Sequence, residues 1–202
     1  MCRPKHSNLD RGSKRIFGEN SENAPKRIRA IVPPKVGLSV WQLIKNRIAV
    51  KKSLLKRGVA IENGELCDIC GLEGDTEAHS IIRCNNSWRL WCSKMDREKV
   101  SWCIPSTFKL LLEEWPSLRV KSDPIWWESA PTLSWSIWRA RNDSAFNQIE
   151  FSFEGVWDTH IMRIMWWIKA WWKECPFCTF DFSQHFEKVM VETITPKVRV
   201  VD

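Results

Sequence analysis

The cysteine and histidine cluster between residues 67 and 84 constrains the fold of this chain more than any other feature. Its spacing is Cys67-x2-Cys70-x8-His79-x4-Cys84. Three thiols and one imidazole this close in sequence are typical of a tetrahedral structural Zn²⁺ site. Because the protein supplies all four ligands, no coordination position stays open for a substrate. The sequence therefore predicts one structural Zn²⁺ and no metal-based catalysis.

The residues between the ligands predict how the chain folds around the metal. Gly71 follows the second cysteine and permits the positive φ angle of a tight turn. Thr76 is placed to cap a short helix that presents His79 from its first turn. On an ideal helix His79 and Cys84 would lie about 140° apart, so we expect the helix to loosen near Arg83. The alternative is a set of buried, apolar cysteines beside a surface histidine.

Charge is unevenly distributed along the 202 residues. Residues 1–60 have a net charge of +12 and residues 61–202 a net charge of −5. So basic a segment is typical of a polyanion binder, and nucleic acid, either RNA or DNA, is the predicted partner; a solvated arm with basic helix faces is the alternative. The predicted phosphate contacts are Lys45, Arg47, Lys51, Lys52, Lys56 and Arg57, with Lys26, Arg27 and Arg29 adding nonspecific attraction.

The cysteine content and the apolar stretches bear on the compartment. Eight cysteines with a start, Met-Cys-Arg-Pro-Lys-His, that lacks an apolar signal region predict a reducing compartment, nuclear or cytoplasmic. The most apolar stretch, residues 161–172, is interrupted by Arg163 and Lys169. It is shorter than the roughly 20 residues that cross a bilayer, so we predict no membrane segment.

Hydrophobic periodicity predicts a mainly α fold, in which a small helical zinc-binding domain precedes a Trp-rich helical hairpin. The helices are expected at about 36–46, 49–57, 88–95, 105–115, 133–148 and 153–173, while residues 188–201 alternate like a strand. The predicted plan is a disordered basic arm (1–30), a zinc-binding domain (31–116), a linker (117–131), a Trp-rich helical pair (132–178) and a tail (179–202).

Fourteen tryptophans and no tyrosine allow two interpretations. Tryptophan rings stack on unpaired bases, at about 1 to 3 kcal/mol per base, but they also fill helical cores. The helical spacing of Trp135, Trp138, Trp157 and Trp172 favours core packing. The tryptophans predicted to be exposed, as an interaction patch, are Trp126, Trp127, Trp166 and Trp171.

A second pair, Cys175-Pro-Phe-Cys178, has three interpretations. It could be a redox dithiol, or half of a second zinc site completed by His185 and either Cys103 or His160. Because the pair follows a Trp-rich helix and no strand, free thiols at a helix exit are favoured. The sequence contains no complete nucleophile or acid/base constellation, so we predict no enzyme.

Several motifs resemble one family, the zinc-binding domain at the carboxyl end of reverse transcriptases of plant non-LTR (LINE-type) retrotransposons. These motifs are Pro33-Pro34-Lys35-Val36, Val40-Trp41, Leu54-Leu55-Lys56-Arg57-Gly58, the Cys67 to Cys84 cluster and Trp135-Ser136-Ile137-Trp138-Arg139-Ala140-Arg141-Asn142. The resemblance implies one bound Zn²⁺ on Cys67, Cys70, His79 and Cys84. It also implies template RNA or target DNA as the partner.

The chain departs from a whole reverse transcriptase because it has no paired-aspartate polymerase motif. The resulting interpretation is a non-catalytic, zinc-stabilised module derived from a retrotransposon protein, which binds RNA or DNA through its basic amino-terminal third. The alternative is a protein-interaction or structural remnant that docks on a polymerase domain of another chain and binds no nucleic acid itself.

Overall fold

The computed structural model describes residues 33–61, 64–103, 105–118, 124–171, 175–185 and 189. The predicted arm, with Lys26, Arg27 and Arg29, lies outside these residues, as does most of the predicted tail. Within the described ranges the chain is helical, and its one β-bridge is isolated, between Leu66 and Gly74. The prediction of a mainly α fold is therefore confirmed. None of the described helices has both the length and the apolar composition that a membrane crossing requires.

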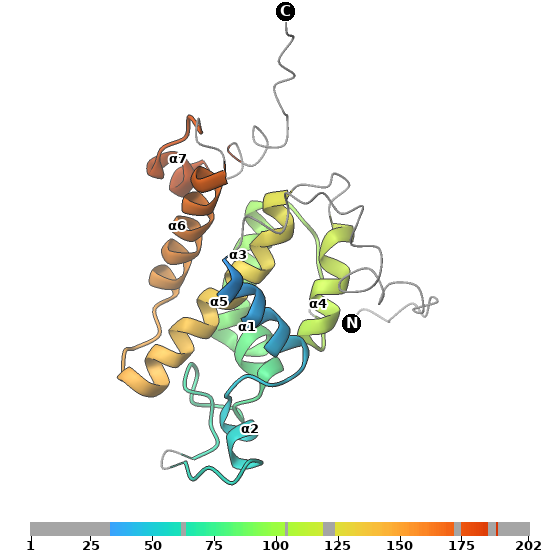
Figure 1. The fold of residues 1–202 in the computed structure, drawn as a ribbon, viewed down its shortest axis with the longest axis vertical. Helices are drawn as coiled ribbons and strands as arrows, with labels where there is room; N and C mark the ends of the chain where they lie inside the picture. The colour runs from blue at the N-terminus through green and yellow to red at the C-terminus, as the bar shows by residue number, and fades with distance from the viewer. Residues whose placement is uncertain are drawn as a thin grey trace, which may run out of the picture.

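Figure 1 shows the helices in chain order. Their bounds are α1 Pro34–Ile44, α2 Lys51–Leu55, a π-helical turn His79–Arg83, α3 Asn85–Arg97, α4 Phe108–Glu114 with a 3₁₀ turn Trp115–Leu118, α5 Pro124–Asn147, α6 Phe153–Trp171 and α7 Thr179–Gln184. α5 is the central element, because it packs against α1, the π-helical turn, the 3₁₀ turn and α6. The short α2 and the long loop after it form the end of the molecule drawn lowest in Figure 1.

α1 begins and ends two residues earlier than the sequence predicted, and α2 is shorter than predicted. Pro34 opens α1, where its missing N–H costs no helical hydrogen bond, and the helix ends at Ile44 because Asn46 adopts φ 50°. Gly58, with φ 78°, ends the turn that follows α2. Leu55, the last residue of α2, is 37% exposed.

α5 begins nine residues earlier than expected, at Pro124 instead of residue 133, and it continues through Pro131. Residues 124–131, which belong to the predicted linker, are therefore helical. A proline inside a helix removes one backbone hydrogen bond. Three hydroxyls near it, on Ser129, Thr132 and Ser134, donate to backbone carbonyls three or four residues earlier. The predicted division into domains stays a prediction.

The stacked pair Trp115 and Trp126 anchors the start of α5 in the core. Their ring centroids are 4.4 Å apart, and each indole N–H donates to the backbone carbonyl of the other residue, at 2.8 and 3.0 Å. The prediction that Trp126 is exposed is therefore wrong, since the residue is fully buried. Trp166 is 58% exposed, as predicted. The side chains of Trp127 and Trp171 lie outside the described residues.

His160 is the most isolated polar group of the core. It lies on α6, is fully buried, and neither ring nitrogen has a hydrogen-bond partner among the described residues. Burial, with the nearby positive charges of Lys94 and Arg163, holds the pKa of His160 well below its usual 6.5. The imidazole is therefore neutral in the folded protein.

We expect His160→Leu to stabilise the protein, and more so in acid. Below a pH of 6.5 the unfolded chain binds a proton at His160 that the folded chain does not, so the wild type loses stability as the pH falls. Leucine removes this linkage and the two unpaired nitrogens. The gain measured by urea unfolding with saturating zinc should be about 1 kcal/mol near neutrality and should grow towards about pH 5.

The difference in stability between the wild type and His160→Leu isolates the contribution of His160. Zinc release in acid affects both equally, and so does Glu128, whose pKa burial raises to about 7. Glu128 acts in the opposite direction, because a carboxyl with a raised pKa stabilises the folded state at low pH and loses that contribution as the pH rises. A gain that stayed constant across the pH range would contradict the assignment of His160 as a buried neutral group.

Candidate metal centre

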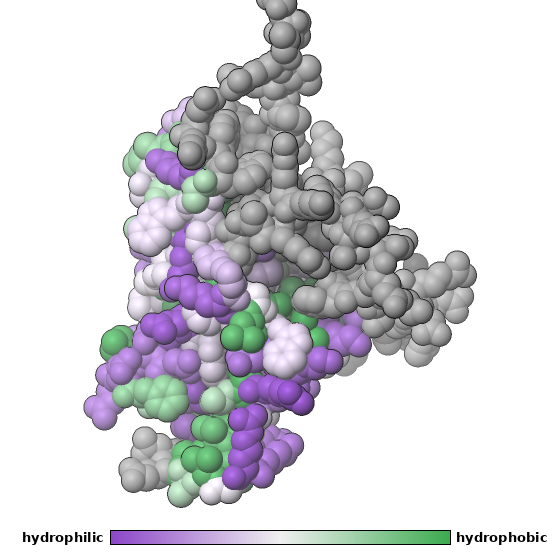
Figure 2. Space-filling view, viewed as in Figure 1, coloured by the Kyte–Doolittle hydropathy of each residue, from purple (hydrophilic) through white to green (hydrophobic). Residues whose placement is uncertain are grey.

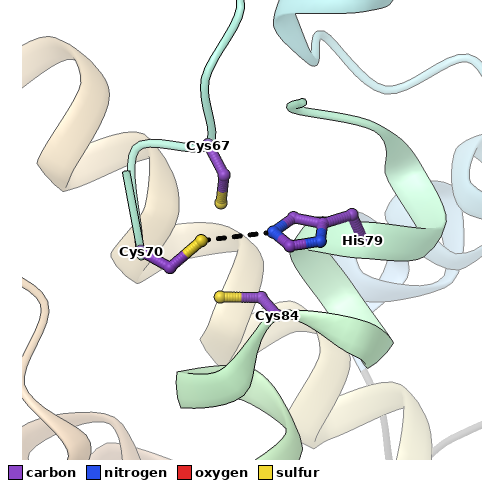
Figure 3. A group of neighbouring side chains, drawn as sticks. All are labelled: Cys67, Cys70, His79 and Cys84. Carbon is purple, nitrogen blue, oxygen red and sulfur yellow. Dashed lines mark hydrogen bonds between the residues drawn. The ribbon is translucent and has the colours of Figure 1, made fainter. Parts of the chain in front are cut away.

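The four predicted ligands come together in one site. The sulfurs of Cys67, Cys70 and Cys84 and a ring nitrogen of His79 all lie within 4.8 Å of one another. Figure 3 shows the four side chains converging from the loop before the π-helical turn, from that turn and from the start of α3. Cys70 Sγ lies 3.3 Å from His79 Nε2. Zn–S bonds of about 2.3 Å and Zn–N bonds of about 2.0 Å place tetrahedral ligands roughly 3.5 to 3.8 Å apart, so the residues fit one Zn²⁺.

The loop that carries the first two cysteines folds back as expected from Gly71. That residue adopts φ 66°, and its N–H donates to the Cys67 carbonyl at 2.8 Å. Two further backbone bonds close the loop, from Cys67 to Glu73 at 2.7 Å and from Asp75 to Glu65 at 2.8 Å. Both cysteines therefore sit on a tight turn whose backbone groups are paired within the loop.

The π-helical turn resolves the geometric conflict between His79 and Cys84. The hydroxyl of Thr76 accepts from the His79 N–H at 3.1 Å, which confirms the predicted cap. The helix then widens over His79–Arg83, and the Cys84 N–H donates to the His79 carbonyl, five residues back, at 2.7 Å. A π-helical turn, with its hydrogen bond between residues five apart, brings these two residues closer to one face than an α-helix does. The expected loosening near Arg83 is thus confirmed.

The three cysteine sulfurs are clustered and mostly buried, an arrangement that a bound cation would stabilise. Cys67 and Cys84 are buried, and Cys70 is half-buried. The hydrogen bond with Cys84 and burial raise the pKa of Cys67, while the same hydrogen bond lowers the pKa of Cys84. A divalent cation would bind these sulfurs as thiolates and compensate their clustered charge, as metal binding to cysteine sites generally does.

Other side chains hold the ligands in place. The Glu73 carboxylate lies 3.1 Å from His79 Nδ1, on the side of the ring opposite to the sulfurs. The contact has no hydrogen-bond geometry in this structure, but a carboxylate at this nitrogen is a common partner of a metal-bound histidine. The Asn86 amide donates to the Ile69 carbonyl at 3.1 Å and so ties the turn between the cysteines to α3.

The exposure of the predicted phosphate contacts agrees with the sequence in all but one of the described positions. Lys45, Arg47, Lys52, Lys56 and Arg57 are exposed. Lys51 is buried, its Nζ lies 2.6 Å from the Asp68 carboxylate, and it donates to the Leu66 carbonyl at 2.9 Å. Lys51 is therefore not available to a phosphate. The helical pattern of the sequence predicted an outward Lys51, because such a pattern does not reveal a carboxylate partner elsewhere in the chain.

Trp41 is an exposed aromatic residue of α1. It is 39% exposed, and the Arg47 guanidinium lies 5.7 Å from the centre of its ring. Arg57 donates to the Arg47 carbonyl at 3.5 Å, so one tryptophan and two arginines lie side by side. The exposure of Trp41 could have been predicted from the helical periodicity. Val36, Val40 and Leu43 form the buried stripe of α1, and Trp41 lies outside it.

Cys175 and Cys178 belong to no group of potential metal ligands among the described residues. Among the residues that the structure describes, only the Cys67 to Cys84 group brings three or more potential ligands together. His160 is buried in the core, and the exposed Cys178 caps α7, with its N–H donating to the Asp181 carboxylate at 2.7 Å. The interpretation as half of a zinc site is therefore not supported.

Comparison with known proteins gives one match. Residues 14–91 match a family model described as zinc-binding in reverse transcriptase. No curated protein and no solved structure matches the chain. The matching family is an accessory zinc-binding domain, distinct from the catalytic reverse transcriptase domain. The narrower resemblance to plant LINE-type elements stays a prediction. Residues 14–91, which include all four candidate ligands, are thus similar to the zinc-binding domain of reverse transcriptases.

Proposed function

We propose that the chain is a non-catalytic, zinc-stabilised module that binds RNA or DNA through a basic-aromatic surface. This surface consists of exposed residues of α1, α2 and the turns that follow them: Trp41, Lys45, Arg47, Lys52, Lys56 and Arg57. Figure 2 shows hydrophilic side chains next to apolar ones at the end of the molecule where α1 and α2 lie in Figure 1. The metal would fix the loop after α2 and so hold α2 against the rest of the domain.

The observation that carries the proposal is the lack of compensating charge. Residues 33–61 contain no Asp or Glu. None of the five exposed cations of the surface forms an ion pair with another described residue. Free lysines and arginines attract phosphates, and a neighbouring tryptophan offers a stacking face to a base, at about 1 to 3 kcal/mol. The charge and the aromatic ring thus suit the same ligand.

Neutralising the surface should weaken binding and flatten its salt dependence. We expect wild-type affinity for an oligonucleotide to fall with salt at a log-log slope of about −0.9 per phosphate contact on duplex DNA, or about −0.7 on a single strand. A variant with Lys45→Gln, Arg47→Gln and Arg57→Gln should lose up to three phosphate contacts, so its slope should be less negative by up to three times that amount. Fluorescence anisotropy with a labelled oligonucleotide, over a range of salt concentrations, measures both quantities.

Lys169→Gln is the matched control, because Lys169 is also an exposed lysine but lies on α6. It should leave the slope unchanged. Equal slopes for the wild type and the triple variant would place the contacts elsewhere. An absence of binding even at low salt would refute nucleic-acid binding by this chain altogether.

A second candidate function, docking on a polymerase domain of another chain, is favoured by the exposed apolar side chains of the carboxyl-terminal helices. Met162 is 38% exposed, Trp166 58% and Phe180 63%. Such side chains mark protein contacts when they gather on one face. Co-purification of the tagged chain after nuclease treatment tests this function. A reverse transcriptase subunit that survives the treatment, and is lost with Trp166→Ala, would favour docking over nucleic-acid binding.

A further inference from the structure

Arg141 of α5 reaches the loop that carries the metal ligands. It is 1% exposed, although it is an arginine. Its Nη2 lies 3.0 Å from the carboxylate of Asp68, the residue that follows Cys67, and it also donates to the carboxylate of Asp75. In sequence these aspartates are 73 and 66 residues away from Arg141. α5 packs against the π-helical turn, and its ribbon passes behind the ligands in Figure 3.

Asp75 connects this arginine to two parts of the zinc-binding domain. One carboxylate oxygen accepts from Ser80 Oγ, inside the π-helical turn that presents His79. The other accepts from the backbone N–H of Lys51 at 2.7 Å, at the start of α2. Asp75 is fully buried, so a cation beside it is needed to balance its charge. Arg141 supplies that cation.

The residue between the first two ligands is held from α5 twice. Arg141 contacts the Asp68 side chain, and Ser144, one turn further along α5, donates to the Asp68 backbone carbonyl at 3.1 Å. Lys51 adds the second cation, so that two buried or half-buried carboxylates face two buried cations. Buried ion pairs contribute most when every member is present, because an unpaired buried charge is strongly unfavourable.

We propose that Arg141 is a positioning residue of the metal site, which sets the places of the cysteine turn and the π-helical turn from a helix outside the segment that matches the family. The metal-binding unit then extends beyond residues 14–91 to include α5, and metal binding and the docking of α5 stabilise each other. The coupling is reciprocal: if the docking of α5 raises the zinc affinity, bound zinc must stabilise the docking of α5 by the same free energy. This inference concerns the chain's own residues and does not depend on nucleic-acid binding.

The test compares the zinc affinity of three full-length variants, measured by competition with a chelator of known affinity. Arg141→Gln removes the positioning cation. Arg139→Gln removes an exposed cation from the same helix. Arg163→Gln removes a half-buried arginine of α6 that donates to Ser136 of α5 at 2.7 Å, so it weakens the packing of α5 without a contact to the metal loop. Loss of a residue that orients metal ligands generally lowers affinity about 10- to 100-fold.

We expect that loss for Arg141→Gln, and affinities within about twofold of the wild type for both controls. Arg141→Lys keeps the positive charge but lacks the planar guanidinium with its several N–H donors. Its zinc affinity should lie between those of Arg141→Gln and the wild type. An equal loss in Arg163→Gln would assign the effect to general stability and overturn the proposal, and so would an unchanged affinity of Arg141→Gln.

A milder variant keeps the test decisive if Arg141→Gln does not fold. Ser144→Ala removes only the hydroxyl that holds the Asp68 carbonyl. It should bind zinc several-fold more weakly than Arg139→Gln, which lies on the same helix. Equal zinc affinities of these two variants would show that α5 does not position the ligands.

Discussion

Removal of the metal by a strong chelator is expected to unfold the segment around residues 61–92. Among the described residues between α2 and α3, this segment has only an isolated bridge and the short helical turns before Cys84, so little regular structure holds it. Structural zinc sites have apparent binding free energies of about 10 to 16 kcal/mol, which is comparable to the whole stability of a domain. Far-UV circular dichroism should show a loss of helix, and limited proteolysis should produce new cleavages within the segment.

The matching substitutions separate the metal ligand from an ordinary cysteine. Cys84→Ser removes a buried ligand and should reproduce the effect of the chelator even in zinc-containing buffer. Cys92→Ser changes a half-buried free cysteine of α3 that belongs to no potential metal group among the described residues, so it should leave the digestion pattern unchanged. If the chelator leaves the proteolytic digestion pattern unchanged, the metal does not stabilise this segment.

Trp126→Ala is expected to destabilise the protein by about 3 to 5 kcal/mol, the usual effect of removing a large aromatic side chain from a core. The substitution loses the stacked contact with Trp115 and the indole hydrogen bond to its carbonyl. It also removes the ring that lies 5.2 Å from the buried Lys94 ammonium. The free energy of unfolding, measured by urea titration with saturating zinc, gives the size of the effect.

Trp166→Ala is the control for this prediction, because it removes the same side chain from the exposed face of α6. Its effect should stay within about 0.5 kcal/mol, as for most surface substitutions. If both substitutions cost the same, Trp126 would not be the anchor that the fold assigns to the start of α5.

The metal site was predictable because its information is local. Cys67, Cys70, His79 and Cys84 span eighteen residues, and the spacing, Gly71 and Thr76 each predicted a feature that the structure contains. Even the break in helical geometry followed from the angle between His79 and Cys84 on an ideal helix. Such arguments need only the short-range geometry of the chain.

The remaining features depend on contacts that sequence patterns do not encode. Lys51 reads as an outward lysine of a short basic helix, and only the buried carboxylate of Asp68 turns it inward. Trp126 lies between prolines in a charged stretch, and its partner Trp115 belongs to another helical segment. The contact between Arg141 and Asp75 spans 66 residues. Periodicity reports which positions share a helix face, but not which face meets a distant partner.

The zinc-edge X-ray absorption spectrum of the purified full-length chain tests the central claim most directly. The account predicts one zinc per chain, with three sulfur ligands at about 2.3 Å and one nitrogen ligand at about 2.0 Å. Protein that contains no zinc after purification in zinc-containing buffer, or zinc surrounded mainly by oxygen, would contradict it.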